Sequence, residues 1–412
     1  EVAEAAMKLA AGADDEAAKL LLMKGAFILH VKDGDLEKAV KTMNALETAI
    51  ADMPPQIITN IIETALLGLP NKAANGTRLY QLLDEMKTAE KSTVADGENL
   101  KAVVDGYTWT YRVKNGEAEI VAEKDGKFVC AVSPSPKGDV TIPSTLGGVS
   151  VTRIGQAAFK GCKGMASVTI PSDVKSIGGW AFEGCSGLSS MEIPDGVKTI
   201  EGCTFWGCGG LKSVMIPSSV TTISDAAFGY CGGLTSMTIP PTVKELRTQV
   251  FFGCGALTSV TIPASVTFIG DQAFISCSSL KTVVFEDASE SKLKTLGARV
   301  FMNCSSLQSV DIPDSVTEMG AMVFTYCTNL QSVTLPKKLT SFDVTSFQYC
   351  ASLTELTIPD CVTEISGYSF SGCSKLTSIV IPDGVTSIGD DAFRYCSSLT
   401  SVTIPDSVTS IG

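Results

Sequence analysis

The stretch LTSVTIPASVTFIGDQAFISCSSL at residues 257–280 decides the fold of this chain. Val260-Thr-Ile-Pro263 is a short β-type segment whose apolar members share one face, and its Pro cannot donate to a sheet and therefore ends the segment. Val266-Thr-Phe-Ile269 follows as a second apolar segment. Phe274 and Cys277 stand three residues apart, a spacing that fits one short helical or 3₁₀ turn. The stretch therefore predicts one coil with apolar residues on its inner side.

This unit recurs along the chain from about residue 140. Every step between its Phe residues is 23 positions except one of 27, and a Cys stands three residues after each Phe. The Phe positions are Phe159, Phe182, Phe205, Phe228, Phe251, Phe274, Phe301, Phe324, Phe347, Phe370 and Phe393. A 23-residue unit cannot bury its apolar face alone, whereas stacked copies can, so the period predicts a solenoid.

The repeated pattern Leu-x-x-Val-x-Ile-Pro-x-x-Val-x-x-Ile-Gly-x-x-Ala-Phe-x-x-Cys closely resembles the BspA-like class of leucine-rich repeat. The resemblance spans residues 140–412 and implies a leucine-rich solenoid of about 11 to 12 coils. It also implies a cell-surface or secreted protein of a bacterium or protist that acts in adhesion or protein binding, without enzymatic activity or a cofactor. All matched positions are structural, so the resemblance assigns no functional residue.

The rest of the chain differs in pattern. Residues 1–92 carry apolar stripes at helical spacing and predict a helical domain. Within about 20–50, Gly34-Asp-Leu-Glu-Lys-Ala39 resembles the turn and second helix of a tetratricopeptide repeat. Residues 93–139 alternate in strand fashion around Asn115-Gly116, which predicts a β-hairpin junction and an N-terminal cap. The expected class is thus a multidomain α+β chain: helical domain, β junction and leucine-rich solenoid over 140–412.

Composition removes several classes of function. The net charge of −12 disfavours nucleic-acid binding, and no apolar run is long enough for a membrane span. A single histidine, His30, excludes most His-based metal sites and catalytic triads. No carboxylate pair, phosphate loop or nucleophile pattern stands out, so an enzyme is the least favoured class. The alternative to a surface adhesion module is an intracellular adaptor that combines helical and leucine-rich repeats.

Candidate partner-binding residues are exceptions to the repeat. The two outward positions of the Val-x-Ile segment are mostly Ser or Thr, and the exceptions include Glu192, Met215, Asp311 and Glu355. Tyr326 and Tyr349 occupy the same position in adjacent coils, where their rings can stack. Glu286 replaces the repeated Pro in the four-residue insertion that breaks the period, and insertions in solenoids form loops on one face. The partner is expected to be a protein or host-surface ligand.

The cysteines form a ladder rather than a cluster. Equivalent thiols in a solenoid lie in a line, whereas zinc requires four convergent ligands. We expect the eleven ladder cysteines to be buried free thiols that act as small hydrophobes. Cys130, Cys203 and Cys361 lie off the ladder, and the last two are expected to be exposed.

The sequence stops at Ser410-Ile-Gly412, within a coil. Val408 and Ile411 keep the inward pattern up to this point, and no charged or helical cap follows. A final coil without a cap exposes apolar core and an unpaired strand edge. We therefore expect the natural chain to continue beyond 412, and the exposed edge of this one to favour end-to-end self-association.

Overall fold

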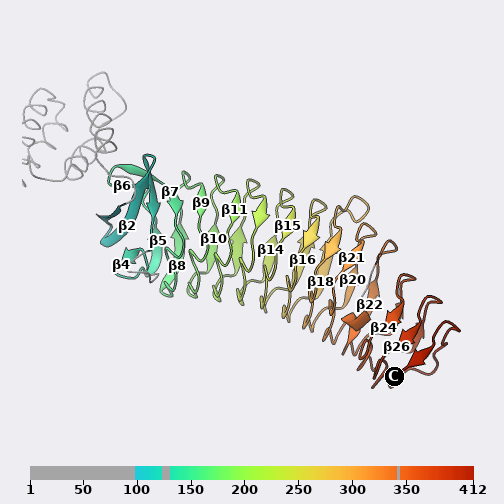
Figure 1. Ribbon diagram of the computed structural model, residues 1–412. Coiled ribbons are helices and arrows are strands. Elements are labelled where there is room, and N and C mark those ends of the chain that lie inside the picture. Colours follow the sequence, from blue (N-terminus) through green and yellow to red (C-terminus); the bar gives the residue numbers. More distant parts are fainter. Residues whose placement is uncertain (1–97, 123–129, 341–343) are drawn as a thin grey trace, which may run out of the picture. The chain divides into compact units, whose positions relative to one another are not determined.

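A computed structural model describes residues 98–122, 130–340 and 344–412 (Figure 1). The helical domain expected at 1–92, with its tetratricopeptide-like segment, lies outside the described residues. Residues 113–118 and 145–150 fall in one compact unit, and residues 99–112, 119–144 and 151–412 fall in another. The solenoid belongs to the second unit.

The expected α+β class is wrong for the part of the chain that the structure describes. That part contains no α-helix, and its single helical segment is the 3₁₀ helix η1 (Val344–Phe347). The other described elements are strands joined by turns, so the architecture there is an all-β solenoid. The Ala-Phe-x-x-Cys segments, where a helical turn was one expectation, are series of tight turns in most coils.

Left-handed residues are the reason that these segments do not become helices. In the first coil Ala157 and Gly161 have φ of 55° and 75°, while Cys162 N–H donates to the Phe159 carbonyl at 3.1 Å. A positive φ interrupts a right-handed helix and leaves a chain of β-turns. The position two residues after Phe is left-handed in all eleven coils, occupied by Gly in five, Tyr in four, and Ser276 and Asn303 in the other two.

One face of the solenoid consists of parallel strands built from the Val-x-Ile segments. Their central residues point inward and are mostly buried, while the residues on either side are mostly exposed, as the Ser/Thr pattern predicted. We call this row the long-strand ladder. Its strands are β8 (Met165–Thr169), β10 (Ser190–Glu192), β12 (Ser213–Met215), β14 (Ser236–Thr238), β16 (Ser259–Ile262), β18 (Thr282–Phe285), β20 (Ser309–Asp311), β22 (Ser332–Thr334), β23 (Glu355–Thr357) and β25 (Ser378–Val380).

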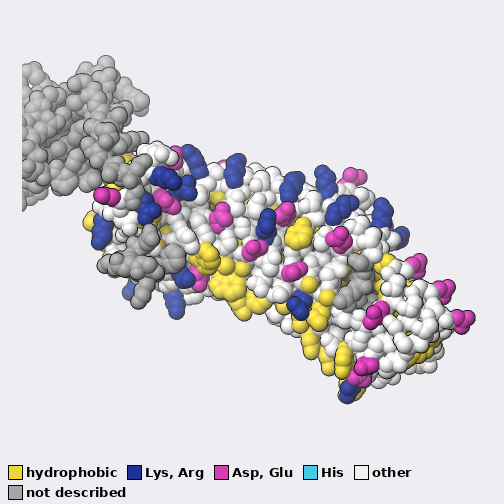
Figure 2. Space-filling view, in the orientation of Figure 1, with side chains coloured by type: hydrophobic (Ala, Val, Ile, Leu, Met, Phe, Trp, Pro, Cys, Tyr) yellow, Lys and Arg dark blue, Asp and Glu magenta, His cyan; other side chains and the backbone are white. Residues whose placement is uncertain are grey.

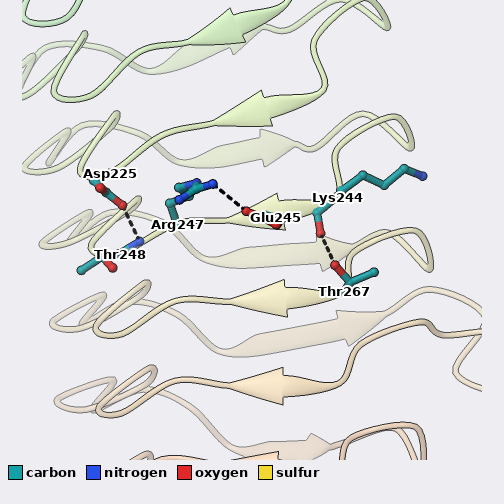
Figure 3. Close-up of polar contacts among 6 residues, drawn as sticks. All are labelled: Asp225, Lys244, Glu245, Arg247, Thr248 and Thr267. Carbon is teal, nitrogen blue, oxygen red and sulfur yellow. Dashed lines mark hydrogen bonds and ion pairs between the residues drawn. The ribbon is translucent and has the colours of Figure 1, made fainter.

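A second row, of two-residue strands, lies on the side of each coil opposite the long-strand ladder. Each of these strands buries its Ile, Leu or Met, except the last, β27, which is exposed. The strands of this short-strand ladder are β9 (Ser176–Ile177), β11 (Thr199–Ile200), β13 (Thr222–Ile223), β15 (Glu245–Leu246), β17 (Phe268–Ile269), β19 (Thr295–Leu296), β21 (Glu318–Met319), β24 (Glu364–Ile365), β26 (Ser387–Ile388) and β27 (Ser410–Ile411). Polar contacts between and within coils line this side (Figure 3): Thr248 N–H donates to Asp225 at 3.1 Å, and Thr267 donates to the Lys244 carbonyl at 3.1 Å.

Short strands precede the first coil, and we call them the β cap. Its elements are β1 (Asn99–Val104), β2 (Tyr107–Lys114), β3 (Glu117–Ile120), β4 (Val132–Ser133), β5 (Gly138–Thr141), β6 (Thr145–Leu146) and β7 (Val149–Ile154). Asn115 and Gly116 both have positive φ, the geometry of a type I′ hairpin turn. Strands β1 and β4 both pair antiparallel with β2.

The core is a continuous stack of phenylalanine rings. All ten successive Phe pairs are stacked, with centroids 5.2–6.0 Å apart and ring planes within 19°. Trp109 of the cap meets the first ring, Phe159, edge-on at 6.2 Å and 74°. The four-residue insertion does not disturb the stack, because Phe274 and Phe301 remain 5.6 Å apart.

Replacing a central ring tests this core. Phe251→Ala should lower the free energy of unfolding by about 3–5 kcal/mol, because it leaves a cavity between two rings in a fully buried column. Phe393→Ala is the matched control, since Phe393 holds the same repeat position but is half-exposed, and about half that loss is expected. Urea unfolding followed by circular dichroism measures both. Equal losses for the two variants would contradict a stack whose strength comes from burial.

Candidate functional site

The outward face of the long-strand ladder brings two of the candidate residues together. Glu192 and Met215 are direct partners in the parallel pairing of β10 with β12, and Met215 is 66% exposed. Asp311 lies further along, where its carboxylate accepts a 2.5 Å hydrogen bond from the hydroxyl of Thr334 on β22. Glu355 begins β23 and pairs with Ser378. These four residues therefore share a face but do not form one cluster.

Glu286 lies apart from this face, in the insertion. Its backbone N–H still bonds the Ile262 carbonyl at 2.9 Å, and Lys292 N–H bonds the Ala264 carbonyl at 2.9 Å, so the segment between them leaves and rejoins the coil. Glu286 is exposed, while Phe285 and Leu293 on either side of the loop are buried at the repeated apolar positions. The expectation of an exterior loop is confirmed.

Two clefts open where neighbouring long strands are not joined in one sheet. Strands β8 and β10 belong to different sheets, and a cleft of about 340 Å³ lies between their coils, lined by Thr169, Glu192 and Asp195 among others. A second cleft of about 560 Å³ lies between the coils of β22 and β23, lined in part by Lys337 and Cys361. The repeat pattern gave no sign of either cleft.

The turns of the solenoid carry a row of aromatic side chains, which we call the aromatic ridge. It comprises Trp206, Tyr230, Phe252, Tyr326 and Tyr349. Trp206 and Phe252 each meet Tyr230 edge-on at 4.9 Å. The rings of Tyr326 and Tyr349 are stacked at 4.9 Å and 7°, which confirms the expected stacking. Figure 2 shows hydrophobic side chains gathered in groups along one edge of the coils.

The tyrosines of the ridge share one backbone conformation. Tyr230, Tyr326 and Tyr349 occupy the left-handed position after Phe, with φ between 56° and 63°. The Tyr230 ring lies against Gly253 of the next coil, where a Cβ would come within 3.0 Å of it, and Tyr349 lies against Gly372 in the same way. The three tyrosines nevertheless remain 37–49% exposed.

Trp206 and Phe252 were not among the candidates drawn from the sequence. They stand one residue after Phe, whereas the tyrosines stand two residues after it, so no single repeat position marks the cluster. The signal available in the sequence was three aromatics on the turn segments of three successive coils. A search for aromatics at either position would have found them.

The cysteine ladder is a set of buried hydrogen-bond donors. Ten thiols, from Cys185 to Cys396, each donate to the Phe carbonyl of the preceding coil at 3.0–3.2 Å. Burial raises the pKa of the Cys231 and Cys277 thiols to about 12. Such thiols are poor nucleophiles because little thiolate forms. The expectation of buried free thiols is confirmed for the nine ladder members from Cys185 to Cys373, whereas Cys396 is half-exposed.

The off-ladder cysteines differ from expectation in their burial. Cys203 and Cys361 are half-buried rather than exposed. Burial, together with the charges of Glu183 and Asp225, raises the pKa of Cys203, and burial raises that of Cys361. Neither thiol therefore has the lowered pKa of a reactive cysteine.

The described residues hold no group of three or more His, Cys, Asp and Glu side chains arranged to bind a metal ion. Within the same part of the chain, no helix has the length and hydropathy needed to cross a membrane.

Comparison with known families matches residues 152–281 and 294–412 to six copies of the model described as "BspA type Leucine rich repeat region". A comparison with curated protein sequences found no match.

Several solved structures are similar over most of their length. A leucine rich cell surface protein from Faecalibacterium prausnitzii A2-165 is 27% identical, with a TM-score of 0.44 over 75% of this chain and 95% of that one. A leucine-rich repeat protein from Bacteroides ovatus ATCC 8483 is 26% identical, with a TM-score of 0.37 over 76% and 95%. Another, from Eubacterium ventriosum ATCC 27560, is 21% identical, with a TM-score of 0.45 over 77% and 94%.

Burial of the ladder predicts which thiols react in the native protein. After treatment with a reductant, iodoacetamide should label Cys203, Cys361 and Cys396, which are half-exposed. The nine ladder thiols from Cys185 to Cys373 are buried and should remain unlabelled until denaturant is added. Peptide mass spectrometry locates the label, and a denatured sample is the control. Labelling of most ladder thiols without denaturant would contradict their burial.

The raised pKa values also predict sensitivity to alkali. Burial disfavours the thiolate, so the folded protein keeps thiol protons that the unfolded chain releases above the ordinary pKa of 9.0. Stability is therefore unaffected by these groups below pH 9 and falls between pH 9 and about 12. Cys277→Ser keeps a donor for the Phe251 carbonyl but removes one titrating group. It should reduce the slope of unfolding free energy against pH by about 1.4 kcal/mol per pH unit.

Urea unfolding under reductant from pH 8 to pH 11 measures this slope. Cys361→Ser is the control, because a half-buried thiol changes the slope less. An unchanged slope in Cys277→Ser would show that the ladder thiols do not govern alkaline unfolding.

Proposed function

Because this chain belongs to the BspA-type leucine-rich repeat family, we propose that it is a non-enzymatic protein-binding or adhesion module of a cell-surface or secreted protein. The family resemblance supports the surface location, and a repeated scaffold supports a binding role, since solenoids present long continuous surfaces to partners. The partner is a protein or a host-surface ligand.

The observation that carries the proposal is the aromatic ridge. Large rings are costly to leave in water, and exposed aromatic groups are enriched where proteins bind one another. Trp and Tyr also bury a large area at small cost in side-chain entropy. The rings of Tyr326 and Tyr349 are already stacked and seated, so binding does not have to order them.

Charged and apolar exceptions on the long-strand face serve as secondary contacts in this proposal. Glu192 and Met215 are adjacent on β10 and β12, and Glu192 also lines the smaller cleft. Asp311, Glu355 and Glu286 lie away from the other candidate residues, so each contributes specificity through a single charged contact. Single exposed charges add little affinity, so the ridge supplies most of the binding energy.

The double variant Tyr326→Asn, Tyr349→Asn tests the ridge. Asn fits the left-handed backbone that both tyrosines adopt, as Asn303 does at the same repeat position. The chain should therefore fold normally, while affinity for its partner falls at least tenfold because the stacked pair of rings is lost. Surface plasmon resonance against a panel of purified extracellular-matrix proteins measures the change.

Tyr395→Asn is the matched control, since Tyr395 holds the same repeat position and φ, but the coil before it carries Gly372 there and so offers no ring for Tyr395 to stack on. It should retain full affinity for any matrix protein that the unaltered chain binds. Equal affinity of the double variant would exclude the Tyr326 and Tyr349 pair as the binding surface. Failure of the unaltered chain to bind any protein of the panel would count against adhesion to the matrix.

A further inference from the structure

Cys162 is the exception in the cysteine ladder. The ten later thiols each donate to a Phe carbonyl of the coil before them, as described above. Cys162 lies in the first coil, where no earlier repeat supplies that carbonyl. Its Sγ instead lies 2.9 Å from the Sγ of Cys130, which comes from the N-terminal β cap.

The backbone beside Cys130 fixes this contact. Ala131 N–H donates to the Ala158 carbonyl of the first coil at 2.7 Å, and the Ala131 carbonyl accepts from Thr110 N–H at 2.8 Å. The next residues form β4, which pairs with β2 at Trp109. The sulfur atoms therefore meet because main-chain hydrogen bonds hold both segments, not because two long side chains happen to point together.

We propose that Cys130 and Cys162 form a disulfide that fastens the N-terminal β cap to the first coil of the solenoid. A disulfide bond is about 2.05 Å long, so the sulfurs need to approach by only about 1 Å from their present contact. Two sulfur ligands alone do not make a structural zinc site, which needs four, and the described residues contain no larger metal-binding group.

The bond forms by exchange with a small or protein disulfide as the oxidant. One cysteine thiolate attacks a sulfur of the oxidant, forming a mixed disulfide and releasing one thiolate. The second cysteine then attacks the first and releases the other thiolate. The two protons lost by Cys130 and Cys162 pass to the two released thiolates, so one disulfide is made and one is reduced.

The proposed disulfide would stabilise the N-terminal end of the solenoid. Trp109 in the cap covers the end of the phenylalanine stack by its edge contact with Phe159. The end of a solenoid is where its stacked units open first. A covalent link across a separation of 32 residues limits that opening, and such links persist in the oxidising surroundings of surface and secreted proteins.

The two thiols are also unsuited to rapid redox cycling. The hydrogen bond to Cys162, followed by burial, raises the pKa of Cys130 well above its ordinary value. For Cys162 in the reduced protein, the hydrogen bond with Cys130 lowers the pKa. The hydrogen bond with Cys185 and burial outweigh this effect and raise the pKa to about 12. Exchange in the folded protein is therefore slow, as befits a permanent link rather than a switch.

Oxidation of the purified protein tests the link directly. The protein is reduced and unfolded, refolded with reduced and oxidised glutathione at pH 8.5, blocked with iodoacetamide in denaturant, and digested with trypsin without reduction. We expect the peptide of residues 128–137 joined to that of residues 161–163, lighter by two hydrogens than the sum of the two. The joined peptide should disappear on reduction and be absent from Cys130→Ser, whereas Cys361→Ser should retain it.

Hydrogen exchange measures the consequence. Amides of residues 99–120 should exchange at least threefold more slowly in the oxidised than in the reduced protein, a comparison that needs no variant. Cys130→Ser should show the reduced rate under both conditions. Recovery of both cysteines as separate alkylated peptides, or linkage of either to another cysteine, would overturn the disulfide. Equal exchange rates in linked and reduced protein would show that the disulfide does not limit opening of the β cap. None of these outcomes depends on the proposed binding function.

Discussion

The phenylalanine stack is the interaction on which the other features of the solenoid depend. A coil of 23 residues has too little apolar surface to fold alone, so each coil depends on stacking its Phe ring against those of its neighbours. The stack continues where the strand ladders do not. Strands β22 and β23 belong to different sheets, yet Phe324 and Phe347 remain stacked at 5.8 Å across the same coils. Ring contact therefore holds the coils in line, and the strands can part to form a cleft.

The backbone around each Phe serves two purposes. Its carbonyl accepts the Cys N–H of its own coil and, in ten cases, the thiol of the next coil, which explains why the repeat uses Cys rather than a purely apolar residue. The left-handed residue two positions later turns the chain and presents a side chain to solvent. Where that residue is Tyr, the scaffold displays a ring on a fixed backbone, so the same geometry that builds the core also builds the aromatic ridge.

Much of the fold could be predicted because its information is local. The spacing of Val260, Ile269 and Phe274 identified the inward residues, and Asn115-Gly116 identified the hairpin turn. The stacking of Tyr326 on Tyr349 followed from their equal position in adjacent coils. The turn segments were harder, because Phe and Cys at a spacing of three suit a helical turn as well as a series of β-turns. Positive φ values, which the sequence signals only where Gly recurs, decide between them.

The sequence by itself determined the repeat period, the family, and which side chains of each coil face inward, because a solenoid repeats the same short-range contacts. Only the tertiary structure decided which surface residues meet across coils. It joined Trp206, Tyr230 and Phe252, opened clefts beside β8 and β22, and brought Cys130 of the cap to Cys162. These contacts join residues at unequal repeat positions or across a broken ladder, so the repeat pattern, which aligns only equal positions of neighbouring coils, does not predict them.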